Sequence, residues 1–112
     1  MSTNDSGRSL SPSTAFELLA DPSRRGVLYV LLDSDGPIRY ERLVERVLGR
    51  EITPYDDRRR LHLELHHTAI PKLANSRFVE YDERTRRLRL TDPHDELRPY
   101  LRFARSMDES ES

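Results

Sequence analysis

The sequence contains no cysteine, and this absence excludes disulfide bonds, thiolate metal sites and cysteine nucleophiles. It also has no long apolar run: the longest, residues 27–32, is far shorter than the roughly 20 residues that a membrane-spanning helix needs. The first 13 residues have no apolar core, so we expect no signal peptide there. Together these absences predict a cytoplasmic protein with no membrane association.

Glycine is scarce, and none of the four glycines belongs to a loop of the kind that cradles phosphate groups. No set of nucleophile, base and orienting residue stands out along the chain. His62 and His66 are four residues apart, a spacing that can hold zinc. They also border an apolar stripe, which favours partly buried packing histidines. The sequence therefore predicts no enzyme, no bound metal and no cofactor.

The chain of 112 residues is long enough for one compact domain. We expect a disordered tail over residues 1–13, the domain over 14–92, a C-terminal helix over 93–107 and an acidic tail over 108–112. The overall net charge is −1, yet residues 39–105 hold 16 Arg and Lys against 12 Asp and Glu. This local excess of four positive charges favours a polyanionic partner, although a mixed charged surface explains it equally well.

Two helices are predicted at the start of the domain. The stretch "STAFELLAD" offers a cap at Ser13 or Thr14, followed by apolar residues at helical spacing. In "DPSRRGVLYVLLD", Asp21 is a good N-cap and Pro22 a good first-turn residue. Apolar residues at 27–32 surround most of this second helix, so we expect it to be the buried central one.

A third helix is predicted from Tyr40 to Leu48, with Ile38 before it as one rung of a short strand. A fourth, longer helix begins with Thr53 as its cap and Pro54 in its first turn. Pro71 should kink or interrupt this helix near Ala69. At 100° per residue, its buried side is expected to consist of Leu61, Leu65, Ala69 and Leu73.

The segment "FVEYDERTRRLRLTD" over residues 78–92 has the pattern of strand, turn and strand, with arginines crowded on the turn and the strand after it. A last helix follows, and Pro99 means that it begins near Arg98 or bends there. The order is helix, helix, short strand, helix, long helix, hairpin, helix. This order predicts an α+β fold, mainly α: a winged helix-turn-helix with a two- to three-stranded antiparallel wing.

Two segments resemble known families. "FELLADPSRRGVLYVLL" resembles the opening helices of arsenic-repressor-type transcriptional regulators. "HHTAIPKLANSRFVEYDERTRRLRLTD" is similar to an uncharacterised winged-helix domain abundant in haloarchaea. The resemblance covers roughly residues 14–92 and implies a transcriptional regulator that binds double-stranded DNA. The chain departs from the pattern at Arg77 and Arg86, where relatives often have a glycine in a left-handed conformation, and at Arg39, where a serine or threonine cap is usual.

In a winged helix the long helix enters the major groove, and the wing tip reaches the flanking backbone or the minor groove. Arginine suits both contacts, because it pairs with phosphate and guanine and inserts into narrow minor grooves. An alternative is a solvated turn neutralised by Glu80, Asp82 and Glu83. The predicted DNA contacts are Arg84, Arg86 and Arg87 on the tip, Arg59, Arg60, His67 and Thr68 on the long helix, and Arg42 and Arg46 on the third helix.

Tyr100, Leu101, Phe103 and Met107 nearly encircle the last helix, and packing on one side would leave some of them exposed to water. Terminal helices form the dimer seam in the repressors that the chain resembles. We therefore expect a homodimer through the C-terminal helix, with two long helices at half-sites about 34 Å apart. The alternative function is a winged helix that binds another protein and no DNA.

Overall fold

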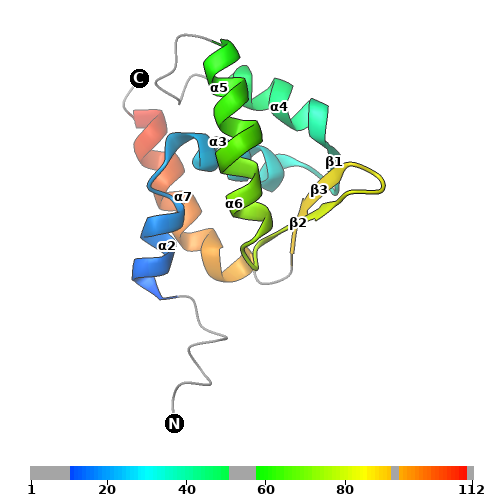
Figure 1. Cartoon of the computed structure of the whole chain (residues 1–112). Coiled ribbons are helices and arrows are strands. Elements are labelled where there is room, and N and C mark those ends of the chain that lie inside the picture. Colours follow the sequence, from blue (N-terminus) through cyan, green and yellow to red (C-terminus); the bar gives the residue numbers. More distant parts are fainter. Residues whose placement is uncertain (1–10, 51–57, 92–93, 111–112) are drawn as a thin grey trace.

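The computed structural model describes residues 11–50, 58–91 and 94–110, and within them the chain is mainly helical with a small antiparallel sheet (Figure 1). This confirms the expected α+β class. The predicted cap at Thr53, the neighbouring Pro54 and most of the two predicted tails lie outside these residues. None of the described helices is long and apolar enough to cross a membrane.

The first described helix, α2 (Pro12–Leu18), begins earlier than predicted. Ser11 is its N-cap and accepts a hydrogen bond from the backbone N–H of Thr14, while Pro12 occupies the first turn. The predicted cap at Ser13 or Thr14 is therefore wrong, because the Ser-Pro pair just before them provides a better start. Residues 12 and 13, assigned to the tail, are already helical.

The central helix α3 (Pro22–Asp33) starts as predicted, with the side chain of Asp21 accepting a hydrogen bond from Arg24 N–H at 3.1 Å. Its residues 27–31 are at most 4% exposed, which confirms α3 as the buried centre. The last helix, α7 (His94–Ser110), packs against it (Figure 1). Leu97 and Leu101 of α7 are fully buried.

Helix α7 passes through Pro99 without ending, so the alternative start near Arg98 is wrong. Pro99 removes one hydrogen bond in the second turn of the helix. The burial of Leu97 and Leu101 on either side of Pro99 keeps both parts of the helix on the core. The helix also continues to Ser110, three residues beyond the predicted boundary at residue 107.

The sheet joins a short strand, β1 (Ile38–Arg39), to a hairpin made of β2 (Val79–Asp82) and β3 (Arg87–Leu90). The strand order is β1-β3-β2, and both pairings are antiparallel. Strand β1 leads directly into α4 (Tyr40–Leu48), whose N-cap residue, Arg39, makes no capping hydrogen bond with its side chain. The short strand, the helix and the hairpin are all as predicted.

The long helix consists of three consecutive parts: α5 (Arg58–Glu64), a π-helical turn η1 (Leu65–Ala69) and α6 (Ile70–Ala74). The π turn lies just before Pro71, so the predicted interruption near Ala69 is confirmed. Proline cannot donate the backbone hydrogen bond of a regular α-helix and its ring crowds the preceding turn, which the wider π turn relieves. The predicted inner side is buried at Leu61, Leu65, Ala69 and Leu73.

Candidate nucleic-acid interface

The nine residues predicted to contact DNA are all exposed, and they come from three parts of the fold. Helix α4 carries two of them, the long helix four and the hairpin three. The sequence order does not reveal whether these three parts share one side of the molecule. In the structure the long helix and the hairpin lie on either side of the first turn of α4 (Figure 1). The nine are Arg42, Arg46, Arg59, Arg60, His67, Thr68, Arg84, Arg86 and Arg87.

Tyr40, in the first turn of α4, connects the long helix to the hairpin. Its hydroxyl forms a hydrogen bond with His66 Nδ1 on the π turn, and its ring meets the Tyr81 ring of β2 edge-on, with centroids 6.0 Å apart. The guanidinium of Arg86 lies 5.9 Å from the centroid of the same ring. Burial, followed by the neighbouring Tyr81, raises the pKa of Tyr40. The exposed side of the π turn and the tip of the hairpin are therefore adjacent.

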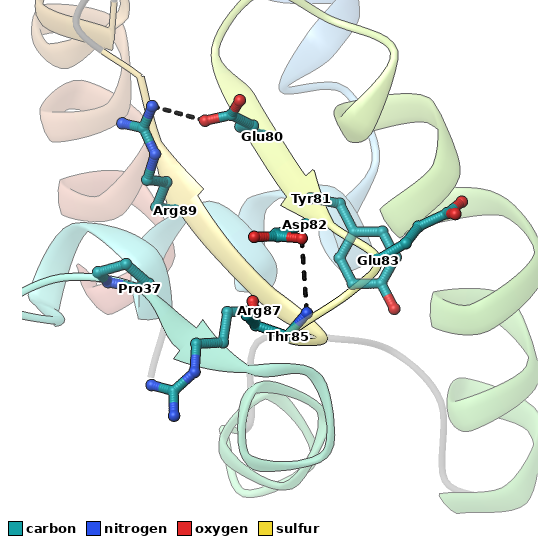
Figure 2. A pocket seen from close by; sticks show the side chains of 8 residues that line it. All are labelled: Pro37, Glu80, Tyr81, Asp82, Glu83, Thr85, Arg87 and Arg89. Carbon is teal, nitrogen blue, oxygen red and sulfur yellow. Dashed lines mark hydrogen bonds and ion pairs between the residues drawn. The ribbon is translucent and has the colours of Figure 1, made fainter.

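On the outward face of the hairpin, acidic residues lie opposite basic ones. The register pairs Glu80 with Arg89 and Asp82 with Arg87. Glu80 and Arg89 form an ion pair, whereas the Asp82 carboxylate accepts a hydrogen bond from the backbone N–H group of Thr85 (Figure 2). The same carboxylate also accepts one from the backbone N–H group of Arg84. These backbone hydrogen bonds lower the pKa of Asp82.

Because Asp82 is engaged with the turn, Arg87 extends away from it (Figure 2). Neither Arg87 nor Arg84 forms an ion pair or a side-chain hydrogen bond with another of the described residues. The hollow between the two strands and Pro37, about 370 Å³ in volume, contains both signs of charge. It is therefore a poor site for an isolated anion, while Arg87, which lines it, remains available to one.

Arg86, the third arginine of the tip, turns toward its own chain. Its Nη2 is 2.6 Å from Oε2 of Glu41 on α4. Its φ angle is 59°, the one positive value of a non-glycine residue in the described part of the chain. Arg86 therefore has a strained backbone, whereas Arg77, the other position where a glycine would suit the expected pattern, does not have a positive φ angle.

Helix α4 has arginines on one flank and glutamates on the other. Arg39, Arg42 and Arg46 line a groove with the loop after α3, about 470 Å³ in volume. Asp33 and Asp35 are also part of that groove. Arg42 and Arg46 form no ion pair with another described residue. This flank can approach a polyanion, although the two aspartates reduce its positive potential.

The histidines of the long helix are more exposed than predicted. His62 and His66 were expected to be partly buried, but both are exposed, and their rings stack with centroids 6.4 Å apart. The expectation is wrong because Leu61 and Leu65 occupy the buried stripe of the helix, and the imidazole rings beside them lie at the surface. Within the described residues, no group of three or more His, Asp or Glu side chains is arranged to hold a metal ion.

Sequence reasoning missed the residues that join the three parts: Tyr40, Tyr81 and Glu41. From the sequence, Tyr40 was predicted only as the first residue of the third helix. An aromatic residue directly after a predicted strand, and another at an inward position of the hairpin, were a usable signal for contact between them. The Glu41–Arg86 pair gave no such signal, because 45 residues separate the two partners along the chain.

The fold and this surface define a small, mainly helical domain whose arginine-bearing hairpin packs on the first turn of helix α4. Residues 16–89, about two thirds of the chain, match the family described as a domain of unknown function (DUF7344), and the chain belongs to this family. No curated protein and no solved structure matches the chain.

Proposed function

We propose that this protein is a sequence-specific DNA-binding transcriptional regulator with a winged helix-turn-helix fold. The order of α3, β1, α4, the long helix and the hairpin, with sheet order β1-β3-β2, supports this assignment. The long helix would enter the major groove, and the hairpin would act as the wing on the flanking backbone or minor groove. The likeness to haloarchaeal winged-helix domains and arsenic-repressor-type regulators belongs to the same proposal.

The observation that carries the proposal is the adjacency of the long helix and the hairpin through Tyr40. This adjacency allows one duplex to contact both parts at the same time. Arg84 and Arg87 are exposed at the edge of the surface without a carboxylate partner among the described residues. They can therefore bind phosphate groups without first breaking an ion pair, which makes them the strongest candidates for wing contacts.

The second candidate function is a winged helix that binds another protein and no DNA. It is favoured by the hairpin itself, where Glu80, Asp82 and Glu83 offset most of the charge of four arginines. A surface with such a small excess of positive charge also suits a polar protein partner. The two functions predict different results when Arg84 and Arg87 are replaced: on the first, DNA binding weakens, and on the second, no DNA is retained before or after the change.

The deciding experiment is selection from a random duplex library, followed by titration of the selected duplex at several salt concentrations. We expect Arg84→Ala and Arg87→Ala each to weaken binding and to reduce the salt slope by about one unit per lost phosphate contact. Arg102→Ala is the matched control, since Arg102 is an exposed arginine on α7 and should leave binding unchanged. If the wild-type protein retains no duplex at low salt, the protein-binding function replaces this proposal.

The proposed regulator is a homodimer formed through α7. Phe103 is 66% exposed and Met107 50%, and both border an apolar hollow of about 310 Å³ between α7 and α2. On the α2 side, Phe16 is 60% exposed and packs edge-on against Tyr100, with ring centroids 5.8 Å apart. In this proposal a second copy covers the surface, and the two long helices of the dimer bind half-sites about one DNA turn, roughly 34 Å, apart.

A further inference from the structure

We infer that Glu41 competes with DNA for Arg86: the ion pair between them holds the central arginine of the wing tip against α4, and DNA engages Arg86 only when this ion pair opens. The inference rests on the proposed function, since it describes how the proposed DNA surface is restrained. In this inference, Glu41 limits the affinity of the proposed surface for DNA, although it contributes no positive charge to that surface.

The pair is built so that a phosphate group can reach it. Arg86 Nη2 lies 2.6 Å from Glu41 Oε2, and each side chain is 56% exposed. A single N–H group makes this contact, so the other donors of the guanidinium remain open. The Tyr40 ring, 5.9 Å from the guanidinium carbon, covers one side of it. An incoming phosphate would therefore approach from the solvent side, where Glu41 already occupies one donor.

The backbone of Arg86 is fixed, which confines the opening to the side chain. The Arg86 carbonyl accepts a hydrogen bond from Tyr40 N–H at 2.8 Å, and the Arg86 N–H donates to the Asp82 carbonyl at 2.7 Å. These two bonds attach the tip to β1–α4 and to β2. Release of the guanidinium from Glu41 therefore requires rotation about side-chain bonds only, and the hairpin stays in place.

The flanking arginines explain why the competition has an effect. Arg84 and Arg87 are exposed and make no ion pair with another described residue, so they can contact phosphate groups first. Arg86 lies next to both, and its carboxylate partner brings a negative charge close to the expected phosphate path. The Glu41 backbone N–H and then Arg86 hold the pKa of that carboxyl below its usual range, so the competitor stays ionised at neutral pH.

The test is Glu41→Gln, with binding measured on the duplex selected by the wild-type protein. Because exposed ion pairs are weak, we expect the Kd to fall by about two- to fivefold. Glu45→Gln is the matched control: Glu45 is one turn further along the same flank of α4, is exposed and has no ion pair with a described residue. It removes the same charge and should change the Kd by less than Glu41→Gln does.

Combining Glu41→Gln with Arg86→Ala isolates the pair itself. If Glu41 acts through Arg86, the gain from Glu41→Gln in the Arg86→Ala background shrinks to that of Glu45→Gln. Wild-type binding without a specific gain from Glu41→Gln, or a gain that persists without Arg86, overturns the inference and leaves the proposed function intact. Failure of the wild type and of every variant to bind any duplex overturns the proposed function as well, and circular dichroism of each variant verifies its fold.

Discussion

At the scale of single residues, Arg86 has a backbone conformation that suits glycine. Its φ angle of 59° lies in the left-handed region, where a side chain with a Cβ atom costs energy. The position is kept there by the backbone hydrogen bonds of Arg86 to Tyr40 and Asp82. The turn therefore stores strain.

The strain can be measured by comparing Arg86→Gly with Arg86→Ala. Both variants lose the guanidinium, so the difference between them reports on the backbone alone. We expect the free energy of unfolding, from urea titration, to be about 1 kcal/mol higher for Arg86→Gly than for Arg86→Ala. At Arg84, where φ is not positive, alanine should be at least as stable as glycine. Equal stability of the two Arg86 variants would show that the turn relaxes.

The exposure of the nine candidate residues could be predicted from the sequence. Those on helices lie at polar positions of a regular helical pattern, and those on the hairpin lie in a polar turn or next to it. Their partners could not. Arg89 binds the residue opposite it across the hairpin, yet Arg86 binds Glu41, which is far away in the chain. Such an ion pair depends on how the hairpin packs on α4, and this packing has no local sequence signal.

At the scale of elements, the C-terminal turn of α7 is attached to α3 by Asp108. Its carboxylate accepts a hydrogen bond from the Tyr29 hydroxyl at 2.8 Å and forms an ion pair with Arg25, with Arg25 Nε 3.0 Å from Oδ2. Tyr29 is fully buried. Burial, then the hydrogen bond to Asp108, raises the pKa of Tyr29, so its hydroxyl remains a proton donor across the physiological range.

Removal of this carboxylate should loosen α7. We expect Asp108→Ala to lower the free energy of unfolding by about 1–3 kcal/mol, because it leaves the buried Tyr29 hydroxyl without its acceptor. Thermal or urea unfolding of the full chain measures the effect. Glu109→Ala is the control: Glu109 is exposed, and its pair with Arg105 on the same helix contributes only a few tenths of a kcal/mol. A loss for Asp108→Ala no larger than for this control would contradict the anchoring role.

The bounds of the helices were predictable where a capping residue and proline mark them, as at Asp21 and Pro22. The same signature at Ser11 and Pro12 was missed, because the polar composition around it resembles a tail. The extension of α7 past residue 107 could not be predicted, since the contacts of Asp108 with α3 are tertiary. Local signals determine where a helix starts, whereas packing partners determine how far it continues.

At the scale of the whole molecule, an exposed apolar surface lies between α2 and α7. Its apolar composition contrasts with the charged surface of the hairpin. Phe16, Phe103 and Met107 contribute to the apolar surface, and each is at least 50% exposed. Contiguous apolar surface of this sort is unusual on a monomer and typical of an interface. The exposure of Phe103 and Met107 was predicted from the distribution of apolar residues around the last helix, whereas the part of Phe16 in this surface was not. The partner that covers the surface belongs to the proposal.

The dimer has a direct test. We expect the wild-type protein to sediment as a dimer at tens of micromolar, and Phe103→Glu to weaken the dimer at least tenfold by placing a charge in an apolar seam. Leu63→Glu is the matched control, because Leu63 is 48% exposed on α5, away from this surface, and should leave association unchanged. Sedimentation of the wild type as a monomer alone would rule out the dimer.

The π turn at Leu65–Ala69 divides the long helix into two segments that are out of phase. One inserted residue rotates everything after it by roughly 100° about the helix axis, relative to an uninterrupted α-helix. A stripe with four-residue spacing drifts by about 40° per step around an α-helix, and the π turn counters this drift. The core side of the long helix therefore stays in line across the turn, through Leu61, Leu65, Ala69 and Leu73. A rigid, grooved partner could follow the outer side of the helix across the turn, and His67 and Thr68, which are exposed within the turn, would share in that contact.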